Sequence, residues 1–120
     1  MDEKYKIYKI YSWTDKRCIF EETNNSFDTL NEALTFVQNN KKLCVLQKSN
    51  LEYDSEQSLT ALDTINSPYR YLVISEYNKK HKRIKIHSRG IKSKNTAINE
   101  LEFNQERDKK HKYSLYKQYN

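Results

Sequence analysis

Hydrophobic and polar residues alternate along four segments of the chain, with the two-residue period of a β-strand. The clearest segments are residues 4–13 (KYKIYKIYSW) and 69–77 (YRYLVISEY). Each is followed by a short polar turn and a second alternating segment, at residues 17–23 and 82–90. The pattern therefore predicts two β-hairpins. A short apolar run, KLCVLQK at 42–48, predicts one further buried strand.

Other segments show apolar residues at helical spacing. Thr29 and Glu32 match a capping box, in which each side chain satisfies a free amide at the start of a helix. The apolar stripe that follows consists of Leu30, Ala33, Leu34 and Val37. A second helix is predicted over residues 54–68, where Pro68 ends it. A third helix is predicted from about Ser93. Whether it runs unbroken to the end of the chain stays open.

These elements predict an α+β fold. We expect a single domain over residues 1–120, with a mostly antiparallel sheet of four to five strands and about three helices. Residues 5–40 and 69–108 both show a hairpin followed by a helix, and DTLNEALTFVQ resembles NTAINELEFNQ. Two explanations stay open: a duplicated ββα unit, or chance similarity in a chain rich in Lys and Asn. A duplication predicts that both hairpins share one sheet, with helices on one face and the other face partly open.

The composition is that of a folded chain with a thin core. Hydrophobic residues make up 36% of the 120 residues and charged residues 32%, but aromatic residues reach 12%, which disordered chains lack. Lys, Asn, Ile and Tyr have AT-rich codons, which indicates an AT-rich genome, that of a virus, a phage or a low-GC bacterium. The start MDEKYKIYK has no apolar leader, and no apolar run is long enough for a membrane span. We therefore expect an intracellular protein, in the cytoplasm, the nucleus or a viral factory, with free thiols at Cys18 and Cys44 and no membrane contact.

Positive charge is concentrated in the second part of the chain. Residues 1–68 carry a net charge of −3 and residues 69–120 a net charge of +9. The stretch 78–95 contains eight Lys or Arg and no acid. Such asymmetry points to nucleic acid or to a membrane surface. The residues predicted to contact DNA or RNA are Lys79, Lys80, Lys82, Arg83, Lys85, His87, Arg89, Lys92 and Lys94.

Strand alternation predicts how this basic stretch is presented. Ile84 and Ile86 point to the core, so Arg83, Lys85, His87 and Arg89 point outward in a row that suits a phosphate backbone. Tyr71 and Tyr77, on the partner strand, are expected to offer stacking surfaces for unpaired bases. The alternative is an ordinary solvated face, or lysines that keep an edge strand from aggregating.

The C-terminal segment combines lysines with tyrosines. Tyr113, Tyr116 and Tyr119 are spaced by three residues, which on a helix places the three rings on one face. We expect this face to bind a protein partner or a second copy of the chain. The alternative is that the rings pack on the domain's own core.

No catalytic, metal or cofactor site is predicted. The cysteines and histidines show no close pair such as CxxC or HxxxH, which zinc sites usually contain. Glu21 and Glu22 are adjacent, so they face opposite sides of a strand, and Glu76 is the one acid of the second hairpin. The chain is therefore expected to be a non-enzymatic, nucleic-acid-binding protein. The alternative is a viral or phage accessory protein that binds a protein partner or forms a homodimer, with no role on nucleic acid.

Overall fold

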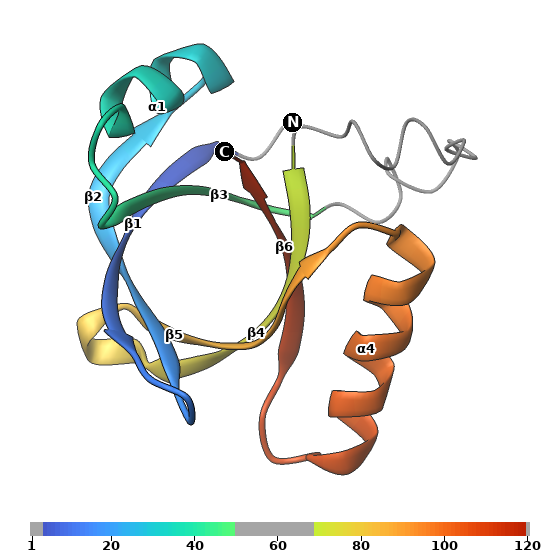
Figure 1. The fold of residues 1–120 in the computed structure, drawn as a ribbon. Helices are drawn as coiled ribbons and strands as arrows, with labels where there is room; N and C mark the ends of the chain where they lie inside the picture. Colours follow the sequence, from blue (N-terminus) through green and yellow to red (C-terminus); the bar gives the residue numbers. More distant parts are fainter. Residues whose placement is uncertain (1–3, 50–68, 120) are drawn as a thin grey trace.

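The computed structural model describes residues 4–49 and 69–119, which form a closed β-barrel of six antiparallel strands (Figure 1). Neighbouring strands follow the order β1-β2-β5-β4-β6-β3 around the barrel. The strands are β1 Tyr5–Trp13, β2 Cys18–Phe27, β3 Leu43–Lys48, β4 Tyr69–Asn78, β5 Arg83–Ile91 and β6 Tyr113–Tyr119. The helices are α1 Leu30–Val37, α4 Lys94–Arg107 and the short 3₁₀ helix η1 Lys79–His81.

The local elements match the sequence pattern, but the predicted fold class is wrong. Both hairpins and the strand at 43–48 are present, Thr29 caps α1 and Ser93 caps α4. The described residues hold two α-helices rather than three, and the predicted helix at 54–68 lies outside them. Instead of an α+β sheet with one open face, β2 pairs with β5 and β3 pairs with β6, so the sheet closes on itself. The face that was expected to be open is the barrel interior.

Residues 113–119 form a strand where a helix was predicted. Helix α4 ends at Arg107, and the chain returns as β6 between β3 and β4. Tyr113, Leu115 and Tyr119 are all buried on the outer face of this strand. The three-residue spacing of the tyrosines fits a helix, but the even spacing of Tyr113, Leu115 and Tyr119 fits one face of a strand equally well. Two neighbouring strands supply backbone partners on both sides of β6, and this decides between the two.

The two halves of the chain have the same connectivity. In each half a hairpin leads into a helix, and the next strand returns to pair with the first strand of its own hairpin: β3 with β1, and β6 with β4. Each three-stranded unit therefore has two free edges. The partner unit covers both edges, through the β2–β5 and β3–β6 pairs. Whether this arrangement comes from a duplicated sequence stays a prediction.

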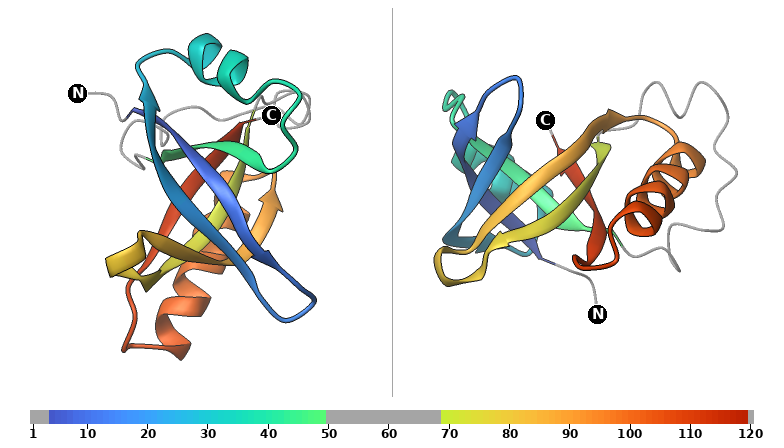
Figure 2. Two further views of the ribbon diagram at one scale, coloured as in Figure 1. Left: turned by 90° about the vertical axis from the view of Figure 1, so that its left-hand side faces the viewer. Right: turned by 90° about the horizontal axis from the view of Figure 1, so that it is seen from below.

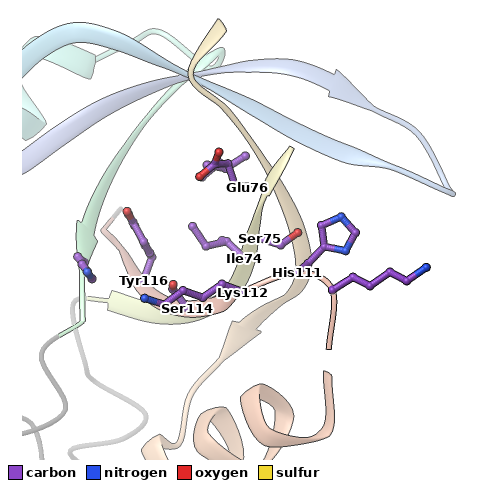
Figure 3. A pocket seen from close by; sticks show the side chains of 10 residues that line it. Ile74, Ser75, Glu76, His111, Lys112, Ser114 and Tyr116 are labelled. Atoms are coloured by element: carbon purple, nitrogen blue, oxygen red, sulfur yellow. The ribbon is translucent and has the colours of Figure 1, made fainter. Parts of the chain in front are cut away.

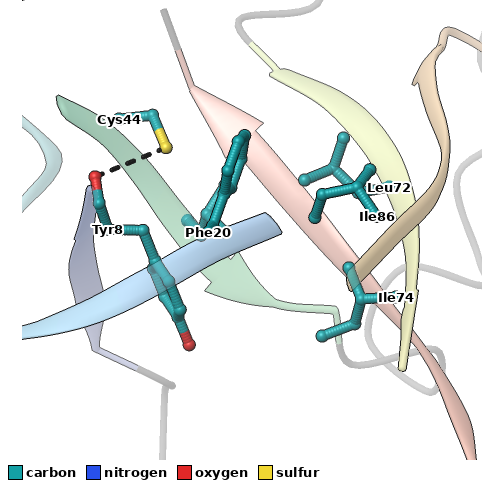
Figure 4. Close-up of a cluster of buried hydrophobic side chains, with 7 residues drawn as sticks. Tyr8, Phe20, Cys44, Leu72, Ile74 and Ile86 are labelled. Atoms are coloured by element: carbon teal, nitrogen blue, oxygen red, sulfur yellow. Dashed lines mark hydrogen bonds between the residues drawn. The ribbon is translucent and has the colours of Figure 1, made fainter. Parts of the chain in front are cut away.

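Three groups of buried side chains form the core. The interior of the barrel is filled by Tyr8, Phe20, Cys44, Leu46, Leu72, Ile74 and Ile86 (Figure 4). Helices α1 and α4 lie on the outside of the barrel (Figure 2). A second group of buried side chains lies beneath α4 and a third beneath α1, and the small side chains of Ala97 and Ala33 let each helix approach the sheet. Where a helix covers the outer face of a strand, that strand is apolar on both sides, because its other face lines the interior. In the described part of the chain, neither helix is long and apolar enough to cross a membrane.

Leu72 tests the importance of the barrel interior, since its side chain is fully buried there. We expect Leu72→Ala to lower the free energy of unfolding by about 2–5 kcal/mol, because the closed wall cannot collapse onto the cavity. Urea denaturation followed by circular dichroism measures this loss. Phe103→Ala, at an exposed ring of α4, is the control and should change stability by less than about 1 kcal/mol. Equal losses in the two variants would contradict this description of the core.

Candidate nucleic-acid interface

Two exposed aromatic rings of the first hairpin lie against arginine side chains of the second hairpin. The Arg83 guanidinium carbon is 3.7 Å from the centre of the Tyr11 ring, and that of Arg89 is 3.8 Å from the centre of the Trp13 ring. Both distances are typical of cation–π stacking. Tyr11 and Trp13 belong to β1, whereas the two arginines belong to β5. Strand β2 lies between them, so each arginine reaches across one strand to its ring.

A third pair joins the β1–β2 turn to β4. Arg17 donates a hydrogen bond from Nη1 to the hydroxyl oxygen of Tyr77 at 3.1 Å, and its guanidinium carbon lies 5.8 Å from the ring centre. These two residues are 60 positions apart in the chain. The six residues of the three pairs are called here the arginine–aromatic surface: Tyr11, Trp13, Arg17, Tyr77, Arg83 and Arg89.

The rings of this surface remain open to solvent. Tyr11, Trp13 and Tyr77 are 52%, 47% and 44% exposed, and they are three of the five large hydrophobic side chains that are exposed in the described part of the chain. Aromatic faces and guanidinium planes both stack on nucleobases. The arrangement therefore offers stacking surface and positive charge at the same positions.

Lysines extend the positive charge beyond the rings. Lys79 and Lys80 are exposed in η1, and Lys82 follows it in a left-handed conformation with φ of 55°. Asn78 caps this short helix by accepting a hydrogen bond from the backbone amide of His81. The η1 segment is therefore a defined turn that holds its cations in solvent. Lys85 lies on β5 between the two arginines of the surface, opposite Ile19 of β2.

Arg83 differs from the free cation that the sequence predicts. Its Nε donates to Glu21 Oε2 at 2.8 Å, and the two residues are register partners in the β2–β5 pair. This carboxylate offsets much of the guanidinium charge and fixes the side chain over Tyr11. Arg83 is therefore better placed to present a flat stacking group than to hold a phosphate.

His87 is a structural residue rather than part of the exposed row. Its Nε2 is hydrogen-bonded to Ser75 Oγ at 2.7 Å, and its ring packs edge-on against Tyr113 with centres 4.8 Å apart. Burial lowers the pKa of His87 below its usual 6.5, helped by the nearby charge of Lys85 and opposed by Asp108. The side chain is therefore neutral near pH 7 and adds no positive charge there.

Three other predicted residues lie away from the surface. Tyr71 is buried beneath α4 and cannot stack on a base, so that expectation is wrong. Lys92 and Lys94 lie at the start of α4, on a different side of the barrel from the β1–β2 hairpin (Figure 1).

The C-terminal tyrosines contribute to the core. Tyr113 and Tyr119 are buried, and their hydroxyls donate hydrogen bonds to Asp108 and Gln47 at 2.9 Å. Hydrogen bonds from His111 and Tyr113 lower the pKa of Asp108 to about 2. Tyr116 is half-buried and packs edge-on against Tyr8, with ring centres 6.5 Å apart. These positions favour the alternative that the rings pack on the domain's own core, and their role in partner binding stays a prediction.

Besides a wide hollow of about 570 Å³ between Phe27 and α1, two smaller hollows of similar size lie among the described residues. One, of about 400 Å³, is lined by side chains that include Ile74, Glu76, Lys112, Ser114 and Tyr116 (Figure 3). Its lining mixes one carboxylate with several cations. The other, of about 390 Å³, lies between Trp13, the β1–β2 turn and Arg89, and so belongs to the arginine–aromatic surface.

The described residues contain no group of three or more His, Cys, Asp or Glu that could hold a metal ion. Cys44 lies in the barrel interior, where burial raises the pKa of its thiol to about 12, and its Sγ donates to the Tyr8 carbonyl oxygen (Figure 4). Cys18 is half-buried, and desolvation also raises its pKa. Both thiols are therefore protonated at neutral pH and poor nucleophiles.

The protein is therefore a small closed antiparallel barrel, with cations and exposed rings on the part of its wall formed by β1, β2, β5 and β4. The chain matches no family model, no curated protein and no solved structure in the comparisons made with each.

Sequence reasoning placed the basic residues of β5 but missed half of the arginine–aromatic surface. The alternation of residues 4–13 predicts only that Tyr11 and Trp13 share an apolar face of the first strand with Tyr5 and Ile7, and nothing in the local pattern singles out Arg17. One local signal was available, because a Trp and a Tyr lie directly before the polar, basic turn TDKR. Only the pairing of β2 with β5 shows that their partners are the arginines of the second hairpin.

His87 predicts how stability depends on pH. Because its folded pKa lies below the unfolded value, the unfolded chain takes up a proton first as the pH falls below about 6.5, and stability decreases until the folded pKa is passed. We expect His87→Gln to flatten this loss between about pH 7.5 and about pH 5.5. Urea denaturation at several pH values measures it. His81→Gln, at an exposed histidine of η1, is the matched control, and an unchanged slope in His87→Gln would contradict the assignment.

Proposed function

We propose that this protein is a non-enzymatic nucleic-acid-binding protein that uses the arginine–aromatic surface and the lysines of η1. One observation carries the proposal: three exposed aromatic rings, two on β1 and one on β4, each lie against an arginine. The cations supply affinity for the phosphate backbone, and the rings supply contact with the bases.

The exposed rings favour this function over a purely solvated face. Lysines alone keep a surface hydrated, and they need no aromatic neighbours for that purpose. Three large rings that are each exposed beside an arginine leave apolar area in water, which is typical of a binding site. Stacking of a base on an aromatic side chain contributes about 1–3 kcal/mol and is tolerant of sequence. Affinity is therefore expected to depend strongly on salt and weakly on base identity.

Tyr11 and Tyr77 test the role of the rings. We expect Tyr11→Ala and Tyr77→Ala each to weaken binding by roughly fivefold to 150-fold, which corresponds to about 1–3 kcal/mol of lost stacking. Fluorescence anisotropy of labelled DNA and RNA, single- and double-stranded, measures the affinity. Tyr11→Phe is the matched control, because it keeps the ring and should bind almost normally.

The lysines are tested separately, by salt. Lys80→Gln should reduce the slope of affinity against salt concentration by about one unit, since one phosphate contact is lost. Arg107→Ala removes an arginine that lies over Phe103 on α4, away from the surface, and should leave both affinity and slope unchanged. No binding of any nucleic acid at low salt would rule out the proposed function.

A further inference from the structure

We infer that the hollow beside Trp13 holds one unpaired nucleobase, so that the preferred ligand is single-stranded nucleic acid. This inference rests on the proposed function and adds the class of ligand to it. The hollow has a volume of about 390 Å³. That is near the lower end of the range for ligand sites, roughly 300–1,000 Å³, and suits a nucleotide rather than a duplex.

The walls of the hollow come from the first hairpin and from β5. Trp13, the turn residues and Cys18 form one side, and β5 forms the other with Ile86, His87 and Arg89. The turn is held by hydrogen bonds: Thr14 and Arg17 exchange backbone bonds, and the Thr14 hydroxyl oxygen accepts from the amides of Lys16 and Arg17. The wall that carries Lys16 and Arg17 is therefore ordered before any ligand arrives, which lowers the entropic cost of binding.

Trp13 is positioned to stack on a base. Arg89 covers one face of the indole at 3.8 Å. Phe20 lies 6.3 Å away at a tilt of 37°, so it supports the indole without lying flat against it. Nearly half of the side chain is exposed, and ring surface therefore remains for a base. A base bound there would extend a stack that already contains the guanidinium of Arg89.

The charges around the hollow suit the phosphates on either side of such a base. Its lining contains Lys16, Arg17 and Arg89 against the single carboxylate of Asp15. Within the described residues, none of these three cations takes part in an ion pair. Arg17 lines the hollow and is hydrogen-bonded to Tyr77, so it links the hollow to a second exposed ring. One base in the hollow and a second against Tyr77 would follow a strand across the surface.

A base in a duplex cannot enter this site without leaving its stack. Unstacking and unpairing cost a few kcal/mol, and a single strand avoids most of that cost. The same surface should therefore bind a single strand more tightly than a duplex of equal length and charge.

Trp13 is the only tryptophan of the chain, so its emission reports directly on the hollow. We expect a short single-stranded oligonucleotide to quench this emission and to protect Trp13 from acrylamide. The duplex of the same sequence should do neither, even at concentrations where anisotropy shows that it is bound. Both measurements use the full-length protein.

Variants separate the stacking from the charge. Trp13→Ala should lower single-strand affinity by roughly fivefold to 150-fold and leave duplex affinity nearly unchanged, so that the preference for single strands is lost. Arg89→Lys keeps the charge but removes the flat guanidinium, and it should reduce the same preference to a smaller extent. Arg107→Ala is again the matched control and should preserve it. Circular dichroism and urea denaturation confirm that each variant is folded.

The outcomes distinguish the inference from the proposed function. If single strands bind while Trp13 emission and acrylamide access stay unchanged, the inference is overturned and the proposed function stands. The same conclusion follows if Trp13→Ala weakens single-strand and duplex binding equally. If no nucleic acid binds at low salt, both fail. Quenching and protection by single strands alone, together with a lost preference in Trp13→Ala, would support the inference.

Discussion

The pairing of β2 with β5 is the contact on which the remaining structure depends. Its ladder is short, running from Ile19 opposite Lys85 to Glu21 opposite Arg83. Without it, each half of the chain would be a three-stranded sheet with exposed edges and an uncovered apolar face. With it, and with the β3–β6 pair on the other side, the inner faces of both halves cover each other. The same pairing places the basic strand β5 one strand away from β1, which carries Tyr11 and Trp13, so closure of the core and assembly of the surface have one cause.

Barrel closure also explains how a chain that is only 36% hydrophobic builds a core. Large rings supply much of the buried volume, with Tyr8 and Phe20 inside the barrel and Tyr71 and Tyr113 beneath α4. Tyrosine suits the boundary positions because its ring is buried while its hydroxyl finds a partner, as Tyr113 does in Asp108. The rings of Tyr11, Trp13 and Tyr77 lie on strands and stay exposed to solvent.

Most local elements could be predicted because their signals are local. Alternation marks the two hairpins, and Thr29 and Ser93 mark the helix starts. The C-terminal strand was missed because Tyr113, Tyr116 and Tyr119 satisfy a helical period as well as Tyr113, Leu115 and Tyr119 satisfy a strand. The fold class was missed because it depends on pairs between strands far apart in the chain. Local periodicity describes the faces of a strand but does not identify its neighbours.

The candidate site likewise has features that the sequence predicts and features that depend on the fold. The basic character of the second hairpin and its anchoring by Ile84 and Ile86 follow from the order of the residues, because charge and alternation are properties of neighbours in the chain. The partners of each cation depend on the fold: Glu21 and Tyr11 for Arg83, Trp13 for Arg89, and Tyr77 for Arg17. In the same way, the fold places His87 against Ser75 and Tyr113, so its side chain is not part of the row of exposed cations. The reason is physical: an ion pair, a stacked ring or a shifted pKa depends on distances of a few ångströms between residues that the chain order separates.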